Sequence, residues 1–240
     1  MNIRNWFVSF SLLFMIFFIS SCDSGEDRRA IAKAKKALSR QRKDTGELDR
    51  VRGELRRTIN RKIQAVRLLE SASRVLGKKY LELGSYYLAE EALLESEFLK
   101  PYNAFIKKDL GECYYFLGLA ASEYEERDKF FSKSRQYYLK TLELEPDLTE
   151  ARYGLGLLLF FGFDEVGGAI GEMQKILEHE TKHVGAHFAL GRFYYEIGEL
   201  NKSLGEYIAL TRILPRNSPK KKKAEENIIR INREMGSNER

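Results

Sequence analysis

The sequence predicts an all-α fold, a solenoid of about four helix-turn-helix units. Four of the seven Leu-Gly pairs in the chain are spaced like a repeat, with glycines separated by 34, 45 and 35 residues. These glycines are Gly77, Gly111, Gly156 and Gly191. A period near 34 residues is typical of repeated helical pairs, because each pair buries its apolar face only against its neighbours.

Other residues mark the same unit. A Tyr or Leu follows three positions after each glycine, namely Tyr80, Tyr114, Leu159 and Tyr194. Three of the four prolines stand 24 to 35 residues after a Leu-Gly glycine, namely Pro101, Pro146 and Pro215. Proline cannot continue the helical hydrogen-bond ladder, so it is suited to the end of a second helix. Glycine and other small residues let two antiparallel helices approach closely.

The spacing divides the chain into consecutive parts. We expect four units, at 70–103, 104–148, 149–183 and 184–217. An amphipathic helix over 47–69 leads into the first unit, and a capping helix and tail over 218–240 cover the last apolar face. The second unit is 11 residues longer than a 34-residue repeat, and its extra residues between Gly118 and Ser134 include no Gly or Pro. We therefore expect longer helices there rather than a loop.

Two stretches of the second unit carry a family resemblance. The sequence LGECYYFLG at 110–118 and the sequence SRQYYLKTLELEPD at 134–147 resemble the two helices of the tetratricopeptide repeat (TPR). The resemblance covers about 150 residues, and the third unit matches least, with Leu159 for Tyr and Thr181 for Pro. It implies a TPR superhelix whose first helices line a concave, partner-binding surface.

The resemblance also nominates the residues of that surface. They are Arg74, Lys78 and Glu82 from the first unit, Phe105, Lys108, Glu112, Tyr115 and Phe116 from the second, Tyr153, Leu157, Phe160 and Phe161 from the third, and Phe188, Arg192, Tyr195 and Glu196 from the fourth. Aromatic anchors beside arginine suit a peptide or an extended apolar ligand. The alternative for each aromatic residue is that it packs between helices.

One TPR activity is not expected. TPR domains that clamp a C-terminal carboxylate use Lys and Asn where this chain has Arg74 and Lys78, and Asp109 adds an acid to the same region.

Residues 1–21 resemble a bacterial lipoprotein signal peptide. Arg4 precedes an apolar run from Trp6 to Ile19 that is too short to span a bilayer comfortably. Small residues then precede Cys22, which would carry the lipid; the alternative is an uncleaved signal anchor. Either way we expect the repeats to lie outside the cytoplasm, attached to the cell membrane or outer membrane.

The charge distribution gives the ends a different character from the repeats. Residues 70–217 carry 18 Lys/Arg against 24 Asp/Glu, a net charge of −6, between strongly basic flanks. Residues 22–46 form a basic tether, in which 28–43 has eight basic residues and no acid. We expect this stretch to associate with an anionic membrane surface, the alternative being a solvated tether. Export argues against a nucleic-acid partner.

All three histidines lie in one motif, H-E-x-x-H at 179–183 followed by His187. In a zinc protease, the two histidines at the ends of such a motif lie one turn apart on a continuous helix. The repeat register instead places His179, Glu180 and His183 in a turn between units, so no metal site, cofactor or enzymatic activity is expected. Cys113 is expected to be a buried structural thiol.

These observations favour a non-enzymatic, membrane-tethered TPR scaffold that binds an envelope protein or peptide. Two alternatives stay open. One is a ligand-binding accessory component of a solute transporter, and the other is a zinc metallohydrolase.

Overall fold

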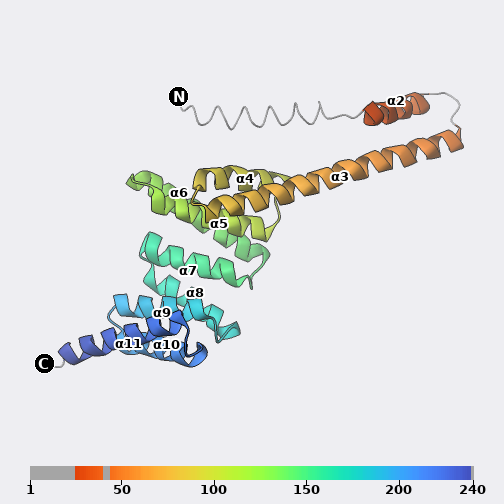
Figure 1. The fold of residues 1–240 in the computed structure, drawn as a ribbon. Coiled ribbons are helices and arrows are strands. Elements are labelled where there is room, and N and C mark those ends of the chain that lie inside the picture. Colours follow the sequence, from red (N-terminus) through yellow and green to blue (C-terminus); the bar gives the residue numbers. More distant parts are fainter. Residues whose placement is uncertain (1–24, 40–43, 239–240) are drawn as a thin grey trace. The chain divides into compact units, whose positions relative to one another are not determined.

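The fold is shown by a computed structural model, which describes residues 25–39 and 44–238. The predicted signal peptide, residues 1–21, and Cys22 lie outside the described residues. The described residues form helices and no strands, as the sequence predicted (Figure 1). The helices are α2 (Gly25–Ser39), α3 (Thr45–Glu82), α4 (Tyr86–Leu99), α5 (Ala104–Ala120), α6 (Tyr124–Leu144), α7 (Thr149–Phe163), α8 (Val166–His179), α9 (Val184–Glu196), α10 (Leu200–Ile213) and α11 (Pro219–Asn238).

The chain divides into two compact units, and the division falls inside α3, between Leu68 and Leu69. In unit 1, α2 packs against the first turns of α3 through Ala34, Ala37 and Val51. Arg61 on α3 also donates to Asp27 on α2 at 2.9 Å. This helical hairpin occupies much of the predicted tether, where no helix was expected from the sequence.

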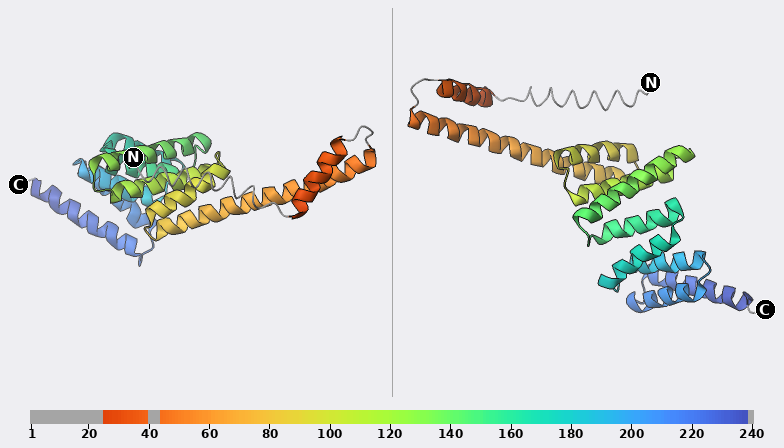
Figure 2. Two further views of the ribbon diagram at one scale, coloured as in Figure 1. Left: turned by 90° about the horizontal axis from the view of Figure 1, so that it is seen from above. Right: turned by 180° about the vertical axis from the view of Figure 1, so that it is seen from behind.

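In unit 2, the helices pair as the repeat spacing predicts. The end of α3 pairs with α4, α5 with α6, α7 with α8, and α9 with α10, while α11 packs on α10. The pairs follow one another in chain order (Figure 2). The predicted fold class, a solenoid of about four helix-turn-helix units with a long N-terminal helix and a capping helix, is confirmed.

The four regularly spaced Leu-Gly glycines lie where the first helix of a repeat packs closely on the second. A Cβ placed on Gly77 would lie 2.6 Å from the Leu93 side chain. A Cβ on Gly111 would lie 2.9 Å from the Tyr138 ring, and a Cβ on Gly191 would lie 2.8 Å from the Tyr207 ring. Any side chain here would displace the facing residue of the second helix, so the period in the sequence reflects one repeated packing constraint.

A serine of the second helix repeats in the same way. Ser96, Ser134 and Ser203 are fully buried. The Ser134 hydroxyl donates to the carbonyl oxygen of Gly111 at 2.7 Å, and the Ser203 hydroxyl donates to that of Gly191 at 2.6 Å. Each bond satisfies a buried hydroxyl and joins the two helices of its repeat.

The second repeat accommodates its extra residues mainly in its second helix. Helix α6 has 21 residues, against 14 in α4, α8 and α10, and α5 has 17. The expectation of longer helices is therefore correct, with most of the added length in α6.

The turns inside three repeats contain one left-handed residue each, Gly84, Asp164 and Gly198. In the third repeat this position belongs to Asp164, with φ of 57°, although glycines lie nearby in the sequence.

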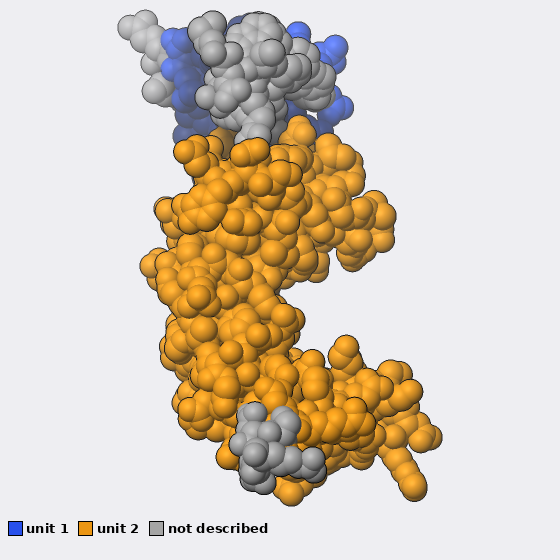
Figure 3. Space-filling model, turned by 90° about the vertical axis from the view of Figure 1, so that its left-hand side faces the viewer, with its two compact units in different colours: residues 1–68 blue, residues 69–240 orange. Residues whose placement is uncertain are grey.

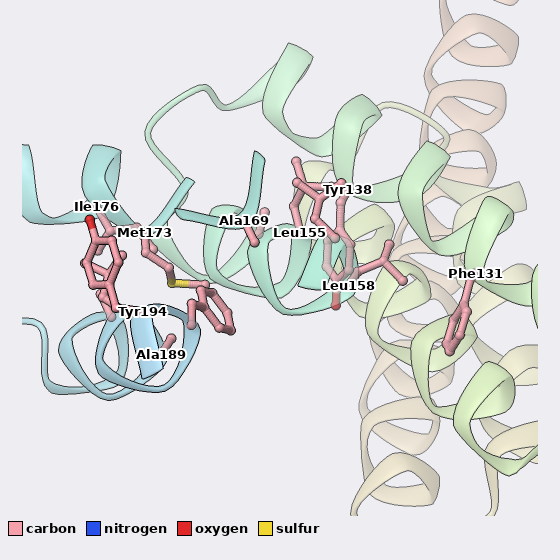
Figure 4. Close-up of a cluster of buried hydrophobic side chains, with 14 residues drawn as sticks. Phe131, Tyr138, Leu155, Leu158, Ala169, Met173, Ile176, Ala189 and Tyr194 are labelled. Atoms are coloured by element: carbon pink, nitrogen blue, oxygen red, sulfur yellow. The ribbon is translucent and has the colours of Figure 1, made fainter. Parts of the chain in front are cut away.

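The largest apolar core joins neighbouring repeats. It contains buried side chains from α6, α7, α8 and α9, from Phe131 to Tyr194 (Figure 4). A second core lies between α4, α5 and α6, and a third joins α10 to α11. This continuity between adjacent helices is what a solenoid requires, because each repeat covers the apolar face of the next.

Candidate partner-binding surface

The first helices of the repeats form one layer of unit 2. Helix α5 contacts α7, and α7 contacts α9, in addition to the contacts that each makes with second helices. In a curved solenoid the helices that approach their counterparts in neighbouring repeats lie on the inside of the curve. Unit 2 is hollowed along one side (Figure 3). We call the accessible side of α5, α7, α9 and the end of α3 the inner surface.

At the centre of the inner surface, the structure brings together side chains from three repeats. Tyr115 lies on α5, Tyr153 on α7 and Arg192 on α9. Burial raises the pKa of Tyr115 above its ordinary value, the nearby Tyr153 raises it further, and the Arg192 guanidinium opposes both effects. Tyr115 therefore lies within electrostatic reach of both Tyr153 and Arg192.

The adjacent phenylalanines of α7 have different environments. The ring of Phe160 stacks on the fully buried ring of Phe193, with centroids 4.1 Å apart. Phe161 is 38% exposed, and the Arg192 guanidinium lies 4.7 Å from its ring centroid. Phe160 thus mainly packs between helices, whereas Phe161 and Arg192 form a solvent-accessible cation–π pair.

At the end nearest the first repeat, the predicted cations are paired within the protein. Arg74 Nε lies 2.8 Å from Asp109 Oδ2, and Lys108 Nζ lies 2.7 Å from Asp109 Oδ1. Asp109 is completely buried. Burial lowers the pKa of Lys108, but the carboxylates of Asp109 and Glu112 outweigh it and the pKa ends above its ordinary value. Of the three lysine and arginine side chains predicted there, Lys78 is the exposed one.

The aromatic residues at this end are only partly covered. Phe105 is 47% exposed, with the Arg74 guanidinium 5.6 Å from its ring centroid. Phe116 stacks on Tyr86 at 5.2 Å. Tyr86 was not among the predicted residues, because the TPR resemblance nominates first-helix positions and Tyr86 begins the second helix α4.

At the other end, the terminal helices engage the predicted residues. The Tyr195 hydroxyl donates to Glu234 on α11 at 2.6 Å, and the Arg230 guanidinium lies 4.4 Å from the Tyr195 ring centroid. Phe188 packs against the core shared by α10 and α11. Tyr195 and Phe188 serve the cap of the solenoid more than an open surface.

The H-E-x-x-H motif lies on a broken segment. Helix α8 ends at His179 and α9 begins at Val184, so the continuous helix of a zinc protease is absent between them. His183 caps α9, where its Nδ1 accepts a hydrogen bond from the Ala186 N–H at 3.0 Å. Nδ1 of His187 lies 2.6 Å from Glu206. Within the described ranges, no group of three His, Cys, Asp or Glu residues is placed to hold a metal ion.

Comparisons with known proteins identify the fold. No family model and no curated protein matches the chain. Among solved structures it is similar to TTC0263, a thermophilic TPR protein of Thermus thermophilus, with a TM-score of 0.61 at 18% identity over 77% of this chain and 92% of the other. It is also similar to MamA residues 41 to the end from Desulfovibrio magneticus, with a TM-score of 0.52 at 16% identity over 70% and 96% of the two chains. The chain therefore has the fold of a TPR solenoid.

Proposed function

We propose that the protein is a membrane-tethered scaffold of the bacterial cell envelope, whose inner surface holds a peptide or helix of another envelope protein. The TPR fold supports the general part of this proposal, a role in protein–protein interaction. The sequence pattern that ends at Cys22 supports the tether. No described helix is both long and apolar enough to cross a membrane.

One observation carries the binding part of the proposal. Phe161 and Arg192 form an exposed aromatic–cation pair, and Tyr115 lies near both Arg192 and Tyr153, so that these side chains come from three successive repeats. Aromatic and arginine side chains dominate the energetics of protein interfaces, because they bury large areas and retain a polar group. An extended peptide that crosses α5, α7 and α9 would contact all of them.

Site-specific crosslinking in living cells tests the binding surface. A photoreactive phenylalanine analogue would replace Phe161 in the full chain, and a control chain would carry it at Leu139, on the second helix α6 and 46% exposed. We expect one discrete adduct from position 161 and none from position 139. Equal adducts from both positions, or none from position 161, would remove the inner surface as the binding site.

The tether has its own test. A Cys22→Ser chain should remain unlipidated, and labelled fatty acid should be incorporated into the native chain alone. Equal incorporation into both chains would contradict a lipid on Cys22.

The transporter-accessory alternative would require a closed apolar pocket around a small molecule. The partial exposure of Phe105 and Phe161 favours an extended partner instead.

A further inference from the structure

The middle of α3 presents an apolar stripe to solvent. Ile59, Ile63 and Val66 are 54%, 44% and 45% exposed. Their spacing of four and three residues places them on one face of the helix. In the preceding turns of the same helix, Val51 and Thr58 are buried in the hairpin with α2. The stripe is therefore a distinct, uncovered part of unit 1.

Within α3, the charged residues around this stripe all have one sign, although Arg61, on the opposite face, pairs with Glu26 and Asp27 of α2. Residues 55–68 contain five Lys/Arg and no Asp or Glu. On a helix with 3.6 residues per turn, Arg56 and Arg67 border the stripe on one side and Lys62 borders it on the other. All three are exposed. Long basic side chains in this position can rest their methylene groups beside an apolar face and extend their charges outward.

This combination favours a lipid surface over another copy of the chain. Two such segments paired along their stripes would bring rows of like charges together. An anionic bilayer instead offers negative headgroups beside an apolar interior, which matches both the basic borders and the stripe. Exposed basic residues on α2, among them Arg28, Arg29 and Lys36, give the same unit further positive charge.

We propose that residues 55–68 of α3 lie in the headgroup region of an anionic membrane, with Ile59, Ile63 and Val66 inserted toward the acyl chains. The inference builds on the proposed location of the protein at a membrane, but it assigns a contact that does not depend on Cys22. A helix lying on the surface would hold unit 1 against the bilayer. A lipid on Cys22 would only limit how far unit 1 can move from the bilayer.

Tryptophan quenching on vesicles tests this contact. The full chain would carry Trp6→Phe and Ile63→Trp, so that residue 63 is its sole tryptophan, since the native chain has one. The probes are vesicles of phosphatidylcholine with phosphatidylglycerol, including a lipid brominated on its acyl chains. We expect a blue-shifted emission and at least a twofold loss of intensity. A matched chain with Leu139→Trp in place of Ile63→Trp should show neither effect.

A charge variant and a tether variant separate the possible failures. Arg56→Glu/Arg67→Glu should abolish the quenching at residue 63, and Cys22→Ser should preserve it. If the lipidated chain floats with the vesicles but residue 63 is not quenched, the surface contact is wrong and the tether stands. If residue 63 is blue-shifted without vesicles and the chain sediments as a dimer, the stripe is a protein interface and the inference is overturned.

Discussion

Arg74 donates a hydrogen bond from Nε to Oδ2 of Asp109 at 2.8 Å, joining the first helix of one repeat to the first helix of the next. The carboxylate is completely buried, and Lys108 lies against its other oxygen. A buried carboxylate needs such partners, because an uncompensated charge inside a protein is costly. Asp109, the acid that argues in the sequence against a carboxylate clamp, is thus part of a structural link between repeats.

Replacing Arg74 should therefore destabilise the solenoid. Arg74→Ala removes one of the two cations that face Asp109, and we expect the free energy of unfolding to fall by about 2 kcal/mol. Urea denaturation followed by circular dichroism measures the change. Arg52→Ala, which breaks an exposed pair with Asp49 on α3, should cost less than about 1 kcal/mol. A similar loss in both variants would contradict the role assigned to the buried link.

The close approach of α5 to α6 gives a second stability prediction. A Cβ on Gly118 would lie 2.4 Å from the buried ring of Phe131, so Gly118→Ala should cost about 1–3 kcal/mol. In α8 of the next repeat, a Cβ on Gly171 would meet nothing within 4 Å, and Gly171→Ala should gain about 0.5–1 kcal/mol through helix propensity. Thermal unfolding of the two variants should shift in opposite directions. A shift of the same sign would contradict the packing argument.

The fold could be predicted from the sequence, but the structure of the inner surface could be predicted only in part. Each of the four regularly spaced Leu-Gly glycines is fixed by a contact inside its own repeat, so the constraint appears as a period in the chain. The Arg74–Asp109 link has no such signal, because it joins different side chains from two repeats. The α2–α3 hairpin was missed because its apolar seam uses small residues, Ala34 and Ala37, within a stretch dominated by basic residues.

The aromatic residues predicted for the inner surface also depend on contacts that the sequence does not reveal. Phe160 and Phe161 are adjacent and chemically identical, and the family resemblance nominated both. Their separate environments depend on Phe193 of the next repeat, which stacks face to face on Phe160 with centroids 4.1 Å apart and meets Phe161 only edge-on, at 6.3 Å. A sequence position can place a residue near a surface, but the neighbouring repeat decides whether its side chain is covered.

Cys113 should be unreactive in the folded protein. Its side chain is fully buried, and burial raises the pKa of its thiol to about 12. At pH 8 the thiolate fraction is then about one in ten thousand. In a Cys22→Ser chain, a maleimide should modify no thiol under native conditions and one thiol after unfolding in urea. Rapid native labelling would show that the α4–α5–α6 core opens far more readily than its packing indicates.

His187 connects the turn between the third and fourth repeats to the last repeat. Its ring lies between Glu206 on α10, at 2.6 Å from Nδ1, and the carbonyl oxygen of Thr181, at 3.1 Å from Nε2. The hydrogen bond to Glu206 raises the pKa of His187 above its ordinary value, burial opposes this, and the bond to Thr181 and the charge of Glu206 add to it. Both ring nitrogens donate when the imidazole is protonated, so the folded state favours the charged form.

This arrangement predicts a stability that falls as the pH rises. Because the folded pKa of His187 exceeds the unfolded value near 6.5, the contribution is complete below pH 6.5 and is lost as the pH rises through the folded pKa. We expect the native chain to exceed a Glu206→Gln variant by about 1 kcal/mol at pH 6, with a smaller margin above pH 8. Urea denaturation of both chains across this range measures the margin. A margin that stays constant, or grows with pH, would mean that His187 is neutral in the folded protein and that Glu206 contributes through another contact.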